Sequence, residues 1–376
     1  MGDVAEIVGG GTPSTKKSEY WNGNINWFSP AEIGNQIFVS HSQKQITELG
    51  LMKSSAKILP AGTILFTSRA GIGNTAILTR NACTNQGFQS IVPYSNKLDS
   101  YFIYSESAKL KRYGETMGSG STFTEVSGKQ LKKMSLHIPN INEQAKIGNM
   151  LKILDQTITL HEEKKRQLER LKSALLQKMF ADKSGYLAVR FKGFDERWER
   201  HVLNDLAIFN PKCTLPTSFE YVDLGSVIGV EMISHKTISK FDAPSRAQRL
   251  AQVGDLFYQT VRPYQQNNYL FDNKDNAYVF STGYAQLRPL IDGYFLLCLI
   301  QTKSFVRKVL NSCTGTSYPA INSQDLAQTS VNIPINSKEQ RLIGNLYKVI
   351  DNLITLYQRK LGDRIILCVR MNSSLK

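Results

Sequence analysis

The feature that most constrains the fold of this chain is an internal repeat. Residues 143–160 read EQAKIGNMLKILDQTITL and residues 339–356 read EQRLIGNLYKVIDNLITL, with ten identities in eighteen ungapped positions. The copies are separated by about half of the 376-residue chain. Because this period is far longer than a solenoid repeat, the sequence predicts two copies of one structural plan.

The spacing of apolar residues predicts that both copies are long helices. Apolar positions alternate four and three residues apart, a heptad seam that favours helices wrapping on one another. Ile138-Pro139 and Ile333-Pro334 precede the two copies, and proline is tolerated at the start of a helix rather than inside it. The alternative is that each is an ordinary amphipathic helix buried in a core of its own. The predicted seam comprises Ile147, Leu151, Leu154, Ile158, Leu168, Leu175, Ile343, Tyr347, Ile350, Ile354 and Leu361.

Each helix follows a stretch that is typical of a globular domain. Short apolar runs broken by Gly, Pro, Asn and Ser precede the first helix and indicate a mostly β domain with some helix. The second half repeats this pattern with looser agreement, and Leu203 to Ala207 align with Met1 to Ala5. We therefore predict an α+β fold with a pseudo-twofold repeat. Its parts are a first domain over 1–139, a helix over 140–185, a linker and second domain over 186–334, and a second helix over 335–376.

Composition indicates the partner and the compartment. A formal net charge of +15 and a pI near 9.5 favour a polyanion such as nucleic acid or an anionic membrane. No signal peptide and no bilayer-length apolar run is present in the sequence. The five cysteines are scattered and lack the spacing of zinc ligands, which favours a reducing cytoplasm.

Four glycine-rich or polar loops are candidate DNA contacts. Two of them, at 118–123 and 314–318, recur at the same distance before each Ile-Pro pair, whereas those at 8–17 and 67–74 lie in the first domain. A fifth stretch, 260–268, is dense in Arg, Gln and Asn, which bind guanine and adenine edges. The alternatives are a plain turn, a surface salt bridge for Arg69 and an ordinary polar loop. The candidates are Ser14, Thr15, Lys16, Lys17, Ser68, Arg69, Asn74, Ser121, Thr122, Arg262, Tyr264, Gln265, Asn267, Thr316 and Ser317.

Catalysis has little support in the sequence. We find no Asn/Asp-Pro-Pro-Tyr methyltransferase signature, no glycine fingerprint for a methyl donor and no Walker loop. The five histidines show no metal-ligand spacing, so we predict neither catalytic residues nor a bound metal.

Several motifs together carry a resemblance to a known family. They are the stretch Gly9 to Ser14 followed by Tyr20-Trp21 and Asn26 to Pro30, the run Ser68 to Gly73, the Gly-Ser-Gly-Ser-Thr loop, and the Ile-Pro-x-x-x-Glu-Gln helix entry. Over essentially its whole length, the chain resembles the specificity subunit of type I restriction–modification enzymes.

The resemblance has definite implications for structure and function. It implies that the helices pair as an antiparallel coiled coil and that each domain is a target recognition domain reading one half of a split, asymmetric DNA site. It further implies that two modification subunits methylate adenine and that restriction subunits join them. S-adenosylmethionine, ATP and magnesium would belong to those partners, while this chain performs no chemistry. The rival hypotheses are a sequence-independent DNA-bridging scaffold and a standalone nuclease or methyltransferase.

One departure from the family pattern concerns the segment Val189 to Trp198. It precedes the second domain, and no counterpart precedes the first. We expect such a segment to tie the N-terminus near the end of the second helix, so that the first domain is less firmly anchored without it. An upstream extension should then raise stability or partner binding.

Overall fold

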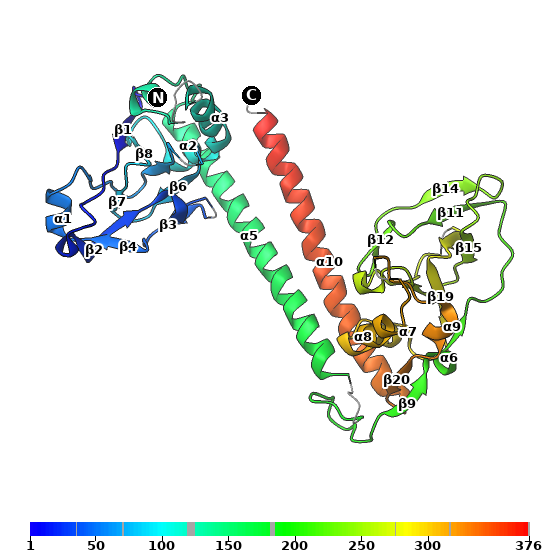
Figure 1. Ribbon diagram of the computed structural model, residues 1–376. Coiled ribbons are helices and arrows are strands. Elements are labelled where there is room, and N and C mark those ends of the chain that lie inside the picture. Colours follow the sequence, from blue (N-terminus) through cyan, green and yellow to red (C-terminus); the bar gives the residue numbers. More distant parts are fainter. Residues whose placement is uncertain are drawn as a thin grey trace. The chain divides into compact units, whose positions relative to one another are not determined.

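The chain divides into two compact units. The computed structural model describes residues 1–34, 36–69, 71–118, 125–180, 185–274, 276–315 and 317–374, with side chains up to residue 362. The first unit comprises Met1–Thr159 with Arg364–Lys376, and the second comprises Leu160–Asp363. Both mix helices with sheets, which confirms the predicted α+β class (Figure 1).

The first unit contains two sheets and a group of short helices before its long helix. A five-stranded sheet has the order β1-β8-β5-β6-β3, and a three-stranded sheet has the order β4-β2-β7. The strands are β1 (Ala5–Gly9), β2 (Trp21–Phe28), β3 (Phe38–Val39), β4 (Lys44–Ile46), β5 (Ile64–Phe66), β6 (Thr75–Leu78), β7 (Cys83–Thr84) and β8 (Gln89–Pro93). The helices are η1 (Ser18–Tyr20), η2 (Pro30–Glu32), α1 (Glu48–Met52), α2 (Ser100–Ser105), α3 (Ser107–Gly118), α4 (Gly128–Lys132) and the first part of α5 (Ile141–Lys178).

The second unit repeats this arrangement with additional strands. Its sheets have the orders β10-β19-β16-β17, β14-β11-β18-β15, β12-β13 and β20-β9. The strands are β9 (Glu199–Val202), β10 (Ala207–Phe209), β11 (Ser218–Val222), β12 (Val227–Ile228), β13 (Glu231–Met232), β14 (Lys236–Ser239), β15 (Ala247–Leu250), β16 (Leu256–Gln259), β17 (Tyr269–Leu270), β18 (Tyr278–Ser281), β19 (Tyr284–Pro289) and β20 (Ser330–Ile333). The helices are α6 (Leu203–Leu206), η3 (Pro263–Gln265), α7 (Gly293–Ile300), α8 (Lys303–Asn311), α9 (Ser323–Ala327) and α10 (Ser337–Ser374).

The repeat seen in the sequence extends to the sheets. Strands β1, β8 and β5 are neighbours in the first unit, as β10, β19 and β16 are in the second. The registers also match, because Ala5 lies opposite Pro93 and Ala207 lies opposite Pro289. The two globular parts therefore share one plan despite their weak sequence agreement.

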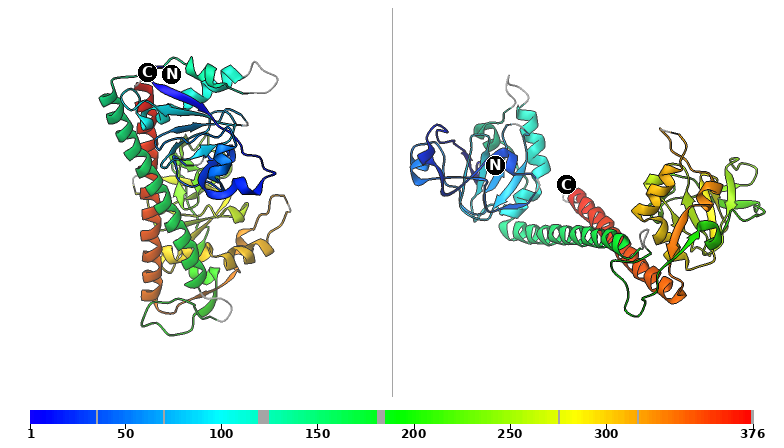
Figure 2. Two further views of the ribbon diagram at one scale, coloured as in Figure 1. Left: turned by 90° about the vertical axis from the view of Figure 1, so that its left-hand side faces the viewer. Right: turned by 60° about the horizontal axis from the view of Figure 1, so that its bottom comes forward.

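The first turns of each long helix are buried in the core of their own unit. Leu151 on α5 is packed among Ile64, Phe66 and Leu110, and Tyr347 on α10 belongs to the core that contains Phe295. Figure 2 shows the strands of each unit beside the beginning of its long helix. The early seam positions Ile147, Leu151, Ile343 and Tyr347 thus pack into two separate cores, as the alternative expected for them.

Several identical residues of the repeat attach each helix to its own unit. The Gln144 side chain accepts a hydrogen bond from the Asp99 amide at 3.0 Å and donates one to the Pro139 carbonyl at 2.9 Å. Gln340 donates to the Pro334 carbonyl at 2.9 Å. These bonds satisfy backbone groups where the chain enters the helix.

The repeated glycine and aspartate serve the same attachment. A Cβ atom on Gly148 would lie 2.7 Å from an Asp99 carboxylate oxygen, and one on Gly344 would lie 2.5 Å from an Asp292 carboxylate oxygen. Tyr101 donates to Asp155 at 2.8 Å, as Tyr294 donates to Asp351 at 2.6 Å. These identical residues of the repeat therefore attach each long helix to its own unit.

In the second unit, the last part of α5 runs antiparallel to α10. Lys172 forms an ion pair with Asp351 at 2.6 Å, and both side chains are largely buried. The Phe180 ring lies 6.0 Å from the Tyr347 ring, and the His161 ring lies 5.4 Å from the Tyr357 ring. Residue numbers rise along α5 as they fall along α10, so the helices have opposite directions here. A regular coiled coil through Leu154, Ile158, Leu168, Leu175, Ile350, Ile354 and Leu361 stays a prediction.

Candidate nucleic-acid interface

The loop at residues 8–17 has a buried base and an exposed tip. Trp27 donates from its indole to the Gly11 carbonyl at 2.8 Å, and Trp21 donates to the Ser14 carbonyl at 3.1 Å. A Cβ atom on Gly10 would lie 1.9 Å from the Asn85 carbonyl oxygen, so this glycine allows close backbone packing. Gly10 therefore serves the packing of the loop base.

The tip of this loop presents the polar side chains to solvent. Ser14, Thr15, Lys16 and Lys17 are all exposed. Lys17 lies 3.9 Å from Glu19, but both side chains are about half exposed, so this contact is weak. The tip therefore offers two cations and two hydroxyls to an approaching phosphate backbone.

The loop after β5 is held rigidly and carries one exposed cation. Thr67 donates to the Gly71 carbonyl at 2.7 Å and accepts from the Asn74 amide at 2.9 Å. Arg69 forms an ion pair with Glu125 at 2.9 Å while its side chain stays 47% exposed. The salt bridge that we kept as the alternative is thus present, and it leaves part of the guanidinium accessible.

Ser68 differs from its neighbours because it is fully buried. Its hydroxyl has no hydrogen-bond partner within the described part of the chain, and it lies away from solvent. A hydroxyl in this position does not reach a DNA surface, so we remove Ser68 from the proposed interface. Asn74 remains half-buried at the end of the same loop.

The corresponding loop of the second unit follows β16. The Arg262 guanidinium stacks over the Tyr318 ring at 4.3 Å, and the Arg262 amide donates to the Pro319 carbonyl at 2.8 Å. These contacts join the loop at 260–268 to the glycine-and-hydroxyl loop at 314–318. Ser317 is exposed on the latter, whereas Ser121, Thr122 and Thr316 lie outside the described residues.

The other candidate DNA-contacting residues on this loop also make contacts within the protein. Gln265 accepts from Gln259 at 2.8 Å, and the Asn267 side chain accepts from the Gly229 amide at 2.9 Å. Tyr264 is half-exposed and lines, with Gln265, a cavity of about 670 Å³ whose wall includes Lys172 and Asp351. This part of the loop thus faces the helix pair as well as solvent.

The loops that carry Arg69 and Arg262 begin at equivalent positions of their sheets. The Ser68 amide donates to the Gly87 carbonyl at 2.8 Å, and the Thr260 amide donates to the Gly283 carbonyl at 3.0 Å. Gly87 and Gly283 lie equally far before the paired residues Pro93 and Pro289, so both loops leave the sheet at the same point. The structure therefore places two loops of one origin, carrying different side chains, in matching positions of the two units.

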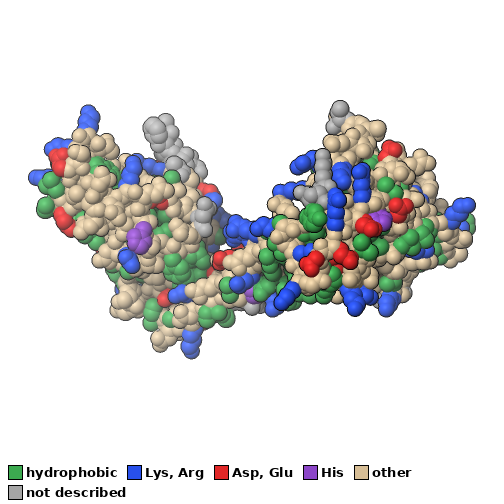
Figure 3. Space-filling model, turned by 90° about the horizontal axis from the view of Figure 1, so that it is seen from below, with side chains coloured by type: hydrophobic (Ala, Val, Ile, Leu, Met, Phe, Trp, Pro, Cys, Tyr) green, Lys and Arg blue, Asp and Glu red, His purple; other side chains and the backbone are tan. Residues whose placement is uncertain are grey.

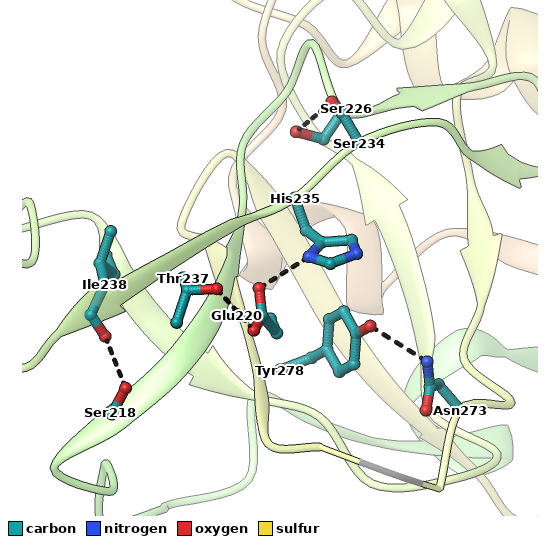
Figure 4. Close-up of polar contacts among 9 residues, drawn as sticks. All are labelled: Ser218, Glu220, Ser226, Ser234, His235, Thr237, Ile238, Asn273 and Tyr278. Atoms are coloured by element: carbon teal, nitrogen blue, oxygen red, sulfur yellow. Dashed lines mark hydrogen bonds and ion pairs between the residues drawn. The ribbon is translucent and has the colours of Figure 1, made fainter.

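A polar cluster of the second unit was missed by sequence reasoning (Figure 4). Glu220 on β11 lies opposite Thr237 on β14 and opposite Tyr278 on β18. His235 pairs with Glu220 at 2.7 Å, Thr237 donates to Glu220 at 2.9 Å, and Asn273 donates to the Tyr278 hydroxyl at 3.0 Å. The hydrogen bond from His235 is the main cause that lowers the pKa of Glu220.

This cluster adds hydrogen-bonding groups to the surface of the second unit. His235 is 43% exposed, and its ring packs edge-on against Tyr278 at 5.3 Å between centroids. The register of β11, β14 and β18 brings these groups together, and no spacing in the sequence signals that register. The first unit has no histidine–glutamate ion pair among its described residues.

On the face drawn in Figure 3, basic side chains, lysine and arginine, occur on both units. Within the described ranges, no group of three or more His, Cys, Asp and Glu side chains is placed to hold a metal ion. Where coordinates are described, no helix combines the length and apolarity needed to span a bilayer.

Comparisons with known proteins agree with this architecture. Residues 1–170 match the family model described as the type I restriction modification DNA specificity domain. The type I restriction enzyme MjaIX specificity subunit of Methanocaldococcus jannaschii is 28% identical over 93% of this chain and 86% of its own length. The EcoR124I/EcoR124II specificity subunit of Escherichia coli is 33% identical over 43% of this chain and 40% of its own.

A solved structure shares the whole fold. The crystal structure of a type I restriction–modification system S subunit from M. genitalium matches with a TM-score of 0.60 and 15% identity. The match covers 98% of this chain and 92% of that one, so both halves of the repeat are included.

Proposed function

We propose, on the premise that this chain belongs to the family of type I restriction–modification specificity subunits, that each of its units reads one half of a split DNA site. The role of the chain is DNA recognition, and it is a non-catalytic subunit. What remains to be assigned is how the two units divide the recognition between them.

The observation that carries this proposal is the pair of matched loops. In each unit an arginine loop leaves the central sheet at the same point, but Arg69 is paired with Glu125 whereas Arg262 is stacked on Tyr318. Phosphate contacts position a protein on DNA, and contacts to base edges specify the sequence. Two scaffolds of one plan with different loop chemistry suit an asymmetric site with two unlike halves.

The partners follow from the same proposal. DNA and other subunits of the type I complex are partners of this chain. We propose two modification subunits that methylate adenine and restriction subunits that join them, in the cytoplasm. S-adenosylmethionine, ATP and magnesium are then bound by those partner subunits.

The test is a genome-wide map of adenine methylation in cells that contain the modification partner, with and without this chain. We expect a split, asymmetric motif that disappears when the chain is removed. An unchanged map would contradict the proposal and favour a DNA-bridging scaffold without sequence preference. Sequence-independent binding of the chain to DNA, with a steep dependence on salt, would favour the same alternative.

Two single substitutions test the division between the units. Arg69→Ala should relax the methylated motif in one half only, and Arg262→Ala should relax it in the other. Loss of one bidentate base contact costs about 1–3 kcal/mol of discrimination. Arg80→Ala and Arg246→Ala are matched controls because both arginines are exposed on the same two units. A uniform loss over all sites would instead identify the arginine as a phosphate contact.

A further inference from the structure

The loop that carries Arg262 has a strained backbone. Arg262 has φ 54° and ψ 56°, and Gln266 has φ 56° and ψ 33°, so the residues on either side of η3 both adopt the left-handed conformation. Among the described residues, the other two that do so without being glycine are asparagines, which tolerate it better. Such strain persists only where the surrounding structure enforces it, and it is concentrated at ligand sites.

Two buried amide side chains enforce this loop conformation. Gln259 donates to the Val261 carbonyl at 2.6 Å and to the Gln265 side chain at 2.8 Å. The Gln259 backbone amide donates to the Asn268 side chain at 2.9 Å, and both Gln259 and Asn268 are buried. The loop is therefore fixed from beneath, and so is the point from which the Arg262 side chain leaves it.

The Arg262 side chain is held from the other end by an aromatic ring. Its guanidinium carbon lies 4.3 Å from the centroid of the Tyr318 ring, a distance at which the ring face attracts a cation. Tyr318 itself is 64% exposed, so the ring contributes little to the core. Within the described ranges the guanidinium makes no hydrogen bond or ion pair, and its N–H donors remain available.

The arginine of the first unit is held in a different way. Arg69 Nε lies 2.9 Å from a Glu125 carboxylate oxygen, so this ion pair engages one of its donors. Contact with a ring holds an arginine without consuming a donor, whereas contact with a carboxylate does consume one. A held guanidinium with free donors matches the O6 and N7 acceptors of guanine, which arginine contacts in a bidentate manner.

Building on the proposed function, in which Arg262 reads the half-site of the second unit, we propose that Tyr318 is its positioning residue. The ring holds the guanidinium for bidentate contact with a guanine. Because the side chain is ordered before DNA arrives, less conformational entropy is lost on binding. The half-site read by the second unit then contains a G·C pair at the position that Arg262 contacts.

Maps of adenine methylation in cells that contain the modification partner test this role. Arg262→Ala and Tyr318→Ala should relax the same G·C position of one half-site. Tyr318→Ala should lower the preference for guanine about 2–5-fold, which corresponds to an exposed cation–π contact. Tyr318→Phe should keep the preference, because phenylalanine retains the ring face. Tyr186→Ala, at a tyrosine of the same unit that is 62% exposed, is the matched control and should leave the motif unchanged.

The possible failures can be told apart. If Arg262→Ala relaxes one half-site while Tyr318→Ala leaves the motif unchanged, the positioning role is wrong and the division between the units stands. An A·T pair at the relaxed position, or failure of phenylalanine to replace Tyr318, would likewise overturn the inference. An unchanged motif in Arg262→Ala would overturn both the inference and the role of Arg262 in the proposed function.

NMR of the full chain tests the positioning without DNA. Protons above an aromatic ring are shielded, so the Arg262 Nε–H signal should move downfield in Tyr318→Ala. It should stay close to its original position in Tyr318→Phe. An unmoved signal in Tyr318→Ala would show that the ring does not hold the guanidinium, and it would overturn the inference whatever the methylation maps show.

Discussion

Single residues decide how closely each long helix approaches its unit. Gly148 and Gly344 face aspartates that cannot move freely, since Asp99 accepts from the Phe102 amide and Asp292 accepts from the Phe295 amide, each at 2.8 Å. A methyl group at either glycine would collide with a capping carboxylate and with backbone. The identity of these two positions in the repeat therefore has a steric cause.

Gly148→Ala and Gly344→Ala should each lower the free energy of unfolding by about 1–3 kcal/mol, the cost of overpacking a close contact. Gly362→Ala is the matched control on α10, because nothing lies within 4 Å of its added Cβ atom. Alanine there should stabilise the helix by about 0.5–1 kcal/mol. Urea denaturation measures all three, and equal effects at the three positions would contradict the steric explanation.

At the same scale, His235 controls the ionisation of Glu220. Because the hydrogen bond from His235 lowers the pKa of Glu220, the ionised carboxylate is favoured in the folded state. Its contribution to stability is present above the unfolded pKa of about 4.3 and is lost as the pH falls through the lower folded pKa. In His235→Asn, we expect NMR titration to show the pKa of Glu220 moving up towards its ordinary value.

Among the helices and strands, some features could be predicted from the sequence and others could not. The apolar spacing of the repeat predicted two long helices, because the 3.6-residue period is a property of the local sequence. Their docking was not predictable, since Tyr101 meets Asp155 from another element fifty-four residues away. The His235–Glu220 pair likewise depends on strand register, and the burial of Ser68 depends on how the loop root packs.

The contact between α5 and α10 in the second unit includes a largely buried ion pair, Lys172–Asp351. Lys172→Met keeps the aliphatic stem but leaves Asp351 with only the Tyr294 hydroxyl among its observed partners. We expect a loss of about 1–3 kcal/mol, because a buried carboxylate loses its counter-ion. Lys165→Met removes the more exposed Lys165–Glu169 pair and should change stability by less than about 0.5 kcal/mol. Thermal denaturation compares the two, and a similar loss in both would contradict a special role for Lys172.

At the scale of the whole molecule, the net charge of +15 makes DNA binding depend on salt concentration. Cations that contact phosphates release counter-ions, so the logarithm of DNA affinity should fall linearly with the logarithm of salt concentration. Lys16→Ala and Lys17→Ala should each reduce that slope by about 0.9 without altering sequence preference. Filter binding at several salt concentrations measures the slope, and Lys338→Ala on α10 provides an exposed control. A changed sequence preference in either loop variant would indicate a base contact instead.

The two units are attached to their long helices in the same way, and this has a consequence for the exchange of gene segments. Each globular half meets its helix through a tyrosine–aspartate hydrogen bond, a glutamine at the helix entry and a glycine beneath an aspartate cap. We expect a gene segment encoding a different recognition half to join the existing helix if it kept the tyrosine, the aspartate and the core residues that pack on Leu151 or Tyr347. We therefore expect a crossover within the coding sequence of the repeated helix to combine one existing half with a different second half.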